Sequence, residues 1–227
     1  MIYTRNLVKG YRSHDVQTSA LINVNIDIDE GEFVAVSGPS GSGKSTLFNI
    51  IGLLEQPDYG EVFFMNREVG FLSDSQRMKL RRGNIGYLFR QFNLVDELTV
   101  FENIELPLLY MNFSRSKRRQ MLEKILYDFK LEHMQKNFPG QLSGVQQQIT
   151  ALARATVFNP VLLLADEPTG SLNSSGGNEI MELLSEVNEA GTTVVIFTNS
   201  RSDAQKAQRI IQLFDGHVVT DMAQKDN

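Results

Sequence analysis

The chain has 227 residues, of which 41% are hydrophobic and 22% are charged, and its net charge is −5. This composition allows a sizeable buried core. The acidic balance gives no general attraction to nucleic acid, so we expect no nucleic-acid partner. The absence of cysteine excludes disulfides and thiolate metal sites. No apolar run approaches the roughly 20 residues that span a bilayer, so any membrane role would run through a partner.

Strand-like runs recur along the chain and alternate with helical segments. They cover residues 23–28, 32–37, 61–65, 84–89, 161–165, 193–197 and 209–214. The second, fifth and sixth runs are almost wholly apolar, as expected of strands that are buried on both faces of a sheet. Helical periodicity follows the glycine-rich turn near residue 40 and covers residues 177–191. This alternation predicts an α/β fold with a largely parallel sheet.

Residues 90–158 have a different character, because they are mostly helical and rich in charge. We predict that they form a helical subdomain inserted into an α/β core, within one domain that spans residues 1–227. A basic cluster lies inside the insert, at Arg115, Lys117, Arg118 and Arg119. We interpret this cluster as a solvated helix face balanced by nearby acidic residues, rather than as a nucleic-acid site.

The segment GPSGSGKST matches the phosphate-loop pattern G-x-x-x-x-G-K-[ST] in full, between a predicted buried strand and a predicted helix. In such a loop the backbone N–H groups surround the phosphates. The Lys44 ammonium can reach the β- and γ-phosphates, and the Ser45 hydroxyl suits Mg²⁺. The predicted nucleotide-binding residues are Gly38, Pro39, Ser40, Gly41, Ser42, Gly43, Lys44, Ser45 and Thr46.

A pair of carboxylates follows the apolar run at 161–165. The carboxyl ends of strands are where ligands bind in α/β sheets. We expect Asp166 to support Mg²⁺ and Glu167 to orient or deprotonate the attacking water, which makes Glu167 the candidate catalytic residue.

The phosphate loop, LSGVQQQ and LLADEPTGSLN resemble the motifs of ATP-binding-cassette (ABC) nucleotide-binding domains in order and spacing, and the resemblance covers nearly the whole chain. Three longer segments are most similar to the MacB/LolD-type subgroup of that family. They are GPSGSGKSTLFNIIGLLEQPDYGEV, RRGNIGYLFRQFNLVDELTVFENIELPLLY and RIIQLFDGHVV.

The resemblance implies a P-loop NTPase (RecA-like) core with an antiparallel β subdomain and the inserted helical subdomain. It implies ATP and Mg²⁺ as cofactors, with Tyr11 stacked on the adenine. It also implies a second ABC protomer, in a homodimer or a heterodimer, whose ATP faces the signature segment. The signature residues are Leu142, Ser143, Gly144, Val145 and Gln146.

By the same resemblance, the chain is the ATPase subunit of an export system. It would drive an integral-membrane permease that moves a lipoprotein, protein or peptide out of the inner membrane. We therefore expect it on the cytoplasmic face of that membrane.

Four positions depart from the family pattern. Arg90 stands where the family has a glutamine, and Val145 replaces the second signature glycine. Asn173 replaces an aspartate, and Asn199 replaces the switch histidine. Arginine is a fixed cation and cannot be a neutral Mg²⁺ ligand, and asparagine cannot carry a proton at neutral pH. A valine costs little where φ is helical and clashes where φ is positive.

Intact phosphate-binding residues beside altered coupling residues predict an ABC-type ATPase with slow or partner-dependent hydrolysis. The alternative is an ATP-binding structural or regulatory subunit without significant turnover. Such a subunit would act as a clamp or as the degenerate half of a heterodimer.

Overall fold

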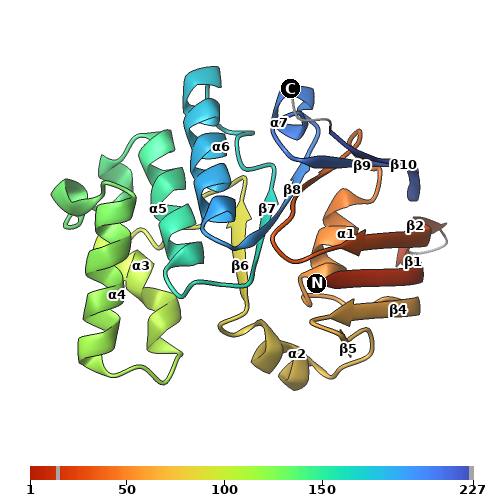
Figure 1. The fold of residues 1–227 in the computed structure, drawn as a ribbon, viewed down its shortest axis with the longest axis horizontal. Helices are drawn as coiled ribbons and strands as arrows, with labels where there is room; N and C mark the ends of the chain where they lie inside the picture. Colours follow the sequence, from red (N-terminus) through yellow and green to blue (C-terminus); the bar gives the residue numbers. More distant parts are fainter. Residues whose placement is uncertain (14–15, 225–227) are drawn as a thin grey trace. The chain divides into compact units, whose positions relative to one another are not determined.

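The computed structural model describes residues 1–13 and 16–224, and its chain divides into two compact units. Unit 1 consists of Met1–Arg81 together with the chain from Thr193 onward, and unit 2 consists of Arg82–Thr192. Figure 1 shows the ribbon of both units, coloured along the sequence. Within the described ranges, no helix has the length and apolar character needed to cross a bilayer.

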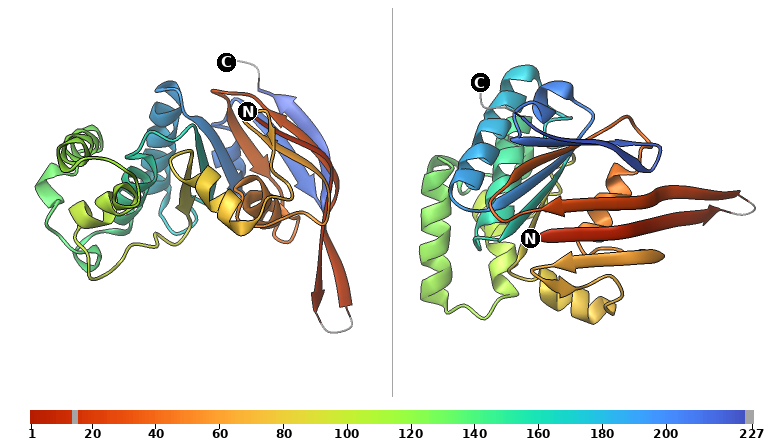
Figure 2. Two further views of the ribbon diagram at one scale, coloured as in Figure 1. Left: turned by 90° about the horizontal axis from the view of Figure 1, so that it is seen from below. Right: turned by 45° about the vertical axis from the view of Figure 1, so that its right-hand side comes forward.

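Unit 1 contains an antiparallel sheet with the strand order β2-β1-β4-β5. Its strands are β1 (Ile2–Ser13), β2 (Val16–Ile28), β4 (Tyr59–Phe64) and β5 (Arg67–Glu68). Strands β1 and β2 form a long hairpin, which Figure 2 shows in two views. One face of the sheet is buried, with core residues Ile2, Leu7, Leu21, Val24, Ile26, Ile28, Val62 and Phe64. This is the antiparallel β subdomain that the resemblance implies.

A second set of strands in unit 1 carries the phosphate loop. It consists of β3 (Phe33–Ser37), β8 (Thr193–Thr198), β9 (Arg209–Phe214) and β10 (His217–Ala223). Strand β3 pairs in parallel with β8 and with β9, and β10 pairs antiparallel to β9. The helices of this unit are α1 (Lys44–Ile51), α2 (Asp74–Arg81) and α7 (Arg201–Ala204). Phe48 of α1 packs edge-to-face on Phe197 of β8, with 5.4 Å between ring centroids, which fixes α1 on the sheet.

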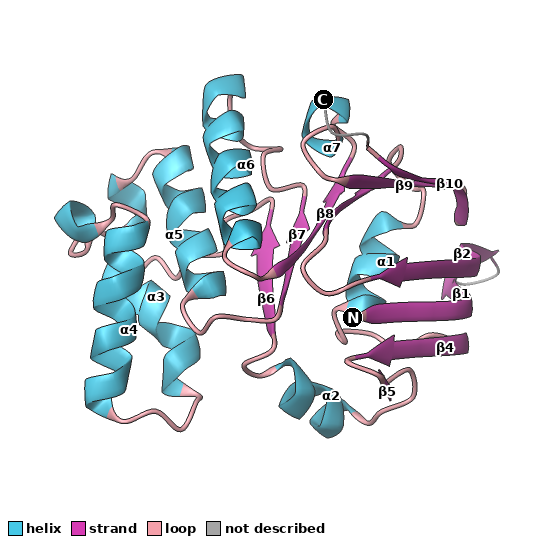
Figure 3. Cartoon of the chain, viewed as in Figure 1, coloured by secondary structure: helices cyan, strands magenta, loops and turns pink. Residues whose placement is uncertain are grey.

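Unit 2 is built around the parallel strands β6 (Ile85–Phe89) and β7 (Leu162–Asp166). Its helices, cyan in Figure 3, are α3 (Val100–Leu109), α4 (Arg115–Asp128), α5 (Gly144–Thr156) and α6 (Ser174–Glu189), with short 3₁₀ turns η1 (Glu132–Met134) and η2 (Pro139–Gln141). Helix α5 approaches β6 closely at Gly86, where a methyl group would overlap the Ala155 carbonyl oxygen. The glycine therefore allows the helix to pack against the strand.

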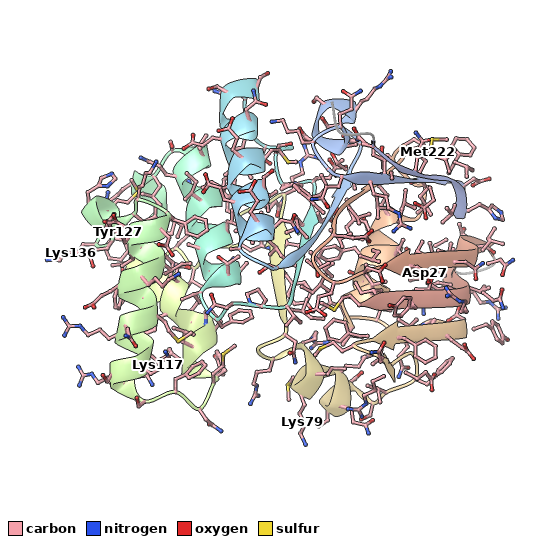
Figure 4. All side chains as sticks on the ribbon, viewed as in Figure 1. Asp27, Lys79, Lys117, Tyr127, Lys136 and Met222 are labelled. Atoms are coloured by element: carbon pink, nitrogen blue, oxygen red, sulfur yellow. The ribbon has the colours of Figure 1, made fainter. Side chains whose placement is uncertain are left out.

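The basic cluster of unit 2 lies on α4. Lys117 is exposed there (Figure 4), whereas Arg118 and Arg119 pair with Glu105 and Glu123 at 3.3 and 2.8 Å. These ion pairs agree with a solvated, charge-balanced helix face. The predicted helical insert, residues 90–158, contains α3, α4 and α5, and its exact boundaries stay a prediction.

The sequence patterns predict the strands at the apolar runs but do not predict β1 or β10. In β1 the buried positions Ile2 and Thr4 are followed by Leu7, because the register shifts around Asn6, whose φ is 50°. This irregularity removes the alternation that marks a half-buried strand. Strand β10 pairs along β9 and has no buried residue, and its apolar residues do not alternate with polar ones.

Candidate functional site

The phosphate loop joins β3 to α1 in unit 1. Gly43, immediately before the helix, has a φ of 103°, which is a left-handed conformation that disfavours side chains. A methyl group at Gly43 would also overlap the Ala20 carbonyl oxygen. At Gly38, a methyl group would overlap the Leu213 carbonyl oxygen. Gly38 and Gly43 are therefore required by the close approach of neighbouring backbone.

Lys44 is held inside its own loop. Its Nζ donates to the Gly38 carbonyl at 2.7 Å and to the Pro39 carbonyl at 2.9 Å, and the residue is buried. Ser45 is exposed in the first turn of α1, and that turn contains no acidic residue. The positive end of the helix dipole and the ammonium are thus placed together, with no neighbouring carboxylate in the turn. This arrangement suits a phosphate.

Tyr11 lies on β1 and is fixed at both its hydroxyl and its ring. The hydroxyl donates to Glu55 Oε2 at 2.7 Å, and the Lys9 ammonium lies 5.7 Å from the ring centroid. Lys9 in turn pairs with Glu55 at 3.2 Å and with Asp58 at 3.1 Å. Burial raises the pKa of the Tyr11 hydroxyl, so it remains a donor at neutral pH. Tyr11 as a whole is 43% exposed, which leaves surface available for stacking.

Two half-buried carboxylates mark the end of β7 in unit 2. Asp166 is the last residue of the strand, and Glu167 follows it. Glu167 has a φ of 46°, a region that residues other than glycine seldom adopt. The Gly170 N–H donates to the Glu167 carbonyl at 3.0 Å and closes the turn. Such strained backbone persists where its surroundings hold it, and it is frequent at functional sites.

With this geometry in view, comparison with known proteins shows a match to the ABC transporter family over residues 21–170. The chain belongs to this family. The ABC transporter ATP-binding protein MJ0796 of Methanocaldococcus jannaschii is 45% identical over 223 residues, which cover 96% of this chain and 95% of that protein. The macrolide export ATP-binding/permease protein MacB of Pasteurella multocida is 39% identical over 227 residues, which cover 100% of this chain and 35% of MacB.

A solved structure supports the same assignment. The dimeric, post-hydrolysis structure of the cassette MJ0796 bound to ADP and Pi matches with a TM-score of 0.90 and 44% identity, over 100% of both chains. The expected P-loop NTPase fold is thereby confirmed. This chain is an ATP-binding subunit of the ABC transporter family, close to MacB and MJ0796.

The altered signature segment of this cassette begins helix α5. Ser143 is the N-cap, and it exchanges hydrogen bonds with Gln146: Ser143 Oγ accepts from the Gln146 N–H at 3.2 Å, and Gln146 Oε1 accepts from the Ser143 N–H at 2.9 Å. Val145 is the second residue of the helix, so its backbone is helical. The valine is therefore accommodated without backbone strain.

Val145 is also packed against the next helix. A methyl group built on Gly176, in the first turn of α6, would overlap Val145 Cγ2. The side chain that replaces the signature glycine thus fills the space that Gly176 leaves open.

Asn173 has a structural role of its own. It is the N-cap of α6, and its Oδ1 accepts from the Gly176 N–H at 2.8 Å. Arg90 lies beside the same turn, because its carbonyl accepts from Ser171 Oγ at 3.2 Å and a methyl group on Gly170 would lie 3.1 Å from its Nε. Three of the four departures therefore gather around the segment from Gly170 to Gly176.

The fourth departure, Asn199, lies in unit 1. It directly follows β8 and is exposed. The next residue, Ser200, caps α7 by accepting from the Asp203 N–H at 3.3 Å. The role of Asn199 toward a nucleotide remains a prediction, as do the roles of the other candidate site residues.

Two residues that order the site loops lie outside the sequence motifs. Arg154 of α5 donates to the Phe92 carbonyl at 3.0 Å and to the Asn93 carbonyl at 2.6 Å. Phe92 and Asn93 lie in the loop that follows Arg90. Asn103 of α3 is fully buried and donates to the Leu98 carbonyl at 2.9 Å while accepting from the Val95 N–H at 2.8 Å. A polar residue on the apolar face of a predicted helix is the signal that indicates such a role.

The Val145–Gly176 contact makes a testable prediction about stability. Gly176→Ala is expected to lower the free energy of unfolding by about 1–3 kcal/mol, because the new methyl group overpacks against Val145. The double variant Val145→Ala/Gly176→Ala is expected to recover most of this loss. Thermal and urea unfolding measure the stability of the single and of the double variant.

The matched control is Gly177→Ala on the same turn. A methyl group there would lie 3.3 Å from Thr169 Cβ, a tight contact without the overlap met at Gly176, so this variant should destabilise less than Gly176→Ala. Equal destabilisation by the two alanines would contradict the role given to Val145.

Proposed function

We propose that this chain is the ATP-hydrolysing subunit of a MacB-like export system and that it drives an integral-membrane permease. The observation that carries this proposal is the glycine loop with the Lys44 ammonium inside it at the start of α1. The relatives support it, since MacB is named as a macrolide export ATP-binding/permease protein. The exported client is proposed to be a lipoprotein, protein or peptide, and the chain is proposed to act at the cytoplasmic face of the inner membrane.

Each site residue has a proposed role. The loop from Gly38 to Thr46 binds the phosphates, and Tyr11 stacks on the adenine. Glu167 orients or deprotonates the attacking water. The signature segment Leu142–Gln146 faces the ATP of a second protomer, in a homodimer or heterodimer, and the dimeric MJ0796 structure supports this arrangement.

Mg²⁺ is proposed to accompany the ATP, with ligands from the Ser45 hydroxyl and the Asp166 carboxylate. Hydroxyl and carboxylate oxygens are hard donors, which Mg²⁺ prefers, and the ion usually completes its shell with phosphate oxygens and water. Ser45 is exposed in unit 1 and Asp166 is half-buried in unit 2, so each side chain is accessible. When bound, the ion would neutralise charge that develops on the phosphates.

The second candidate function is an ATP-held clamp without significant turnover. The fit of the altered residues favours it: Val145 packs against Gly176, and Asn173 caps α6. These two departures are therefore built into unit 2, and restoring glycine at position 145 would leave the space beside Gly176 unfilled.

The permease is proposed to dock near the stretch from Phe92 to Leu109, which mixes apolar and acidic residues. Two of its acids have local partners. Glu102 completes a capping box with Thr99, whose backbone N–H lowers the pKa of the Glu102 carboxyl, and Glu105 pairs with Arg118. Glu97 is exposed on the loop before α3. Reversing its charge tests docking without disturbing the capping box or the Glu105–Arg118 pair.

The test is to isolate the membrane protein that co-purifies with this chain, to reconstitute it in nanodiscs, and to measure binding and ATP hydrolysis. Wild-type chain should bind, and the permease should stimulate its hydrolysis. Glu97→Lys should weaken that binding by about tenfold, which corresponds to about 1.4 kcal/mol, and leave ATP affinity unchanged. Glu179→Lys, an exposed acid on α6, is the control for net charge. No binding by the wild-type chain, or equal effects of the two reversals, would refute the docking proposal.

A further inference from the structure

One buried side chain in α5 joins the two loops that carry Arg90 and Glu167. Gln148 is fully buried, and its Nε2 donates to the Pro168 carbonyl at 2.6 Å and to the Phe89 carbonyl at 3.2 Å. Phe89 ends β6 directly before Arg90, and Pro168 directly follows Glu167. A single amide therefore ties helix α5 to both strand ends.

The orientation of this amide is determined by its partners. Both are carbonyl oxygens, so the nitrogen must face them. The Gln148 Oε1 atom then lies buried and without a hydrogen-bond partner among the described residues. A buried acceptor without a donor is destabilising. The two hydrogen bonds that Gln148 donates to backbone carbonyls offset that cost.

The carbonyl that Gln148 holds belongs to a strained turn. Glu167 has a φ of 46°, and such backbone needs contacts that hold it. Two hydrogen bonds do so, from Gln148 to the Pro168 carbonyl and from the Gly170 N–H to the Glu167 carbonyl. The first comes from another element, and it therefore sets where the turn lies.

Gln148 also lies close to the signature segment. It is the fifth residue of α5, whose N-cap is Ser143, so the signature and Gln148 share one rigid helix. A shift of the helix N-terminus would be carried through the Gln148 amide to the Glu167 turn and to the end of β6.

We propose that Gln148 is a positioning residue, which fixes the backbone of Glu167 and couples its placement to helix α5. This inference rests on the proposed role of Glu167 in hydrolysis. In this role Gln148 acts through the backbone, since its Nε2 donates to two backbone carbonyls.

The test uses Gln148→Met, which keeps the shape and removes both donors together with the buried oxygen. The variant loses two hydrogen bonds, so it should melt below wild type but remain folded at the assay temperature, and it should bind ATP with unchanged affinity. At saturating ATP, kcat should fall by about 10- to 100-fold with unchanged KM, because a displaced catalytic group lowers only the chemical step. The Gly170 amide should exchange with deuterium about tenfold faster, since the turn it closes is no longer held.

Gln147→Met is the matched control. Gln147 is the adjacent residue of α5, and its Nε2 donates to the Leu142 carbonyl at 3.2 Å, within the signature segment. This variant should leave the Gly170 exchange rate near wild type. Equal effects of the two methionines would overturn the inference.

The failure of this inference differs from the failure of the proposed function. Undiminished hydrolysis by Glu167→Gln would refute the catalytic role, whatever Gln148 does. Loss of hydrolysis by Glu167→Gln, with wild-type kcat and wild-type Gly170 exchange in Gln148→Met, would refute the positioning role alone. The exchange measurement requires no turnover, so it tests the positioning role of Gln148 even if hydrolysis is slow. If both Gln148→Met and Gln148→Leu fail to fold, Gln148 is a structural residue and the proposal is wrong.

Discussion

Lys44→Ala is expected to weaken ATP binding by about 10- to 100-fold and to abolish hydrolysis. A hydrogen bond from a charged group contributes about 1.5–3 kcal/mol, and Lys44 supplies the ammonium that the loop holds at the start of α1. Isothermal titration calorimetry with ATP measures the loss directly. The prediction concerns affinity first, because Lys44 belongs to the loop that is proposed to bind the phosphates.

The control for this substitution is Lys79→Ala. Lys79 is an exposed lysine on α2 (Figure 4), so its removal changes the net charge equally without touching the loop. Because Lys44 also donates to the Gly38 and Pro39 carbonyls, a thermal melt must show that the Lys44 variant remains folded. An unchanged ATP affinity in a folded Lys44→Ala protein would count decisively against the phosphate-loop assignment.

Glu167→Gln should reduce ATP hydrolysis by about 10²–10⁴-fold while ATP still binds, because a general base typically contributes that factor. The substitution is isosteric, so the strained backbone at position 167 and its hydrogen bond from Gly170 should be preserved. Hydrolysis is measured by phosphate release, and binding by calorimetry on the same protein.

The same variant separates the two candidate functions. Loss of export with Glu167→Gln would show that the system uses hydrolysis. Export that persists in this variant would show that ATP binding suffices, and the clamp would then replace the ATPase. Asp203→Asn is the control carboxylate, since Asp203 lies on α7 and outside the proposed site.

The sequence predicts the chemical groups of the site better than it predicts the residues that hold them in place. The phosphate loop and the Asp166–Glu167 pair are contiguous motifs, so their residue types and spacing are visible in the chain. The same holds for β3, β7 and β8, because strands buried on both faces read as unbroken apolar runs. Family membership follows from such contiguous segments, and the comparisons confirm it.

The departures show where sequence reasoning stops. From the motifs alone, Val145 and Asn173 read as losses. The structure shows Val145 filling the space above Gly176 and Asn173 capping α6. A family pattern records which residue is absent, whereas the packing shows what the replacement contacts.

The sequence by itself determined the fold class, the nucleotide-binding loop and the candidate catalytic carboxylate, because each depends on local pattern and on the order of motifs. Only the tertiary structure decided how the site is held. Gln148 and Pro168 are 20 residues apart, and Arg154 and Phe92 are 62 residues apart, yet each pair is joined by a hydrogen bond. Such bonds depend on how helices and strands pack, and packing brings together residues whose spacing in the chain carries no periodic signal.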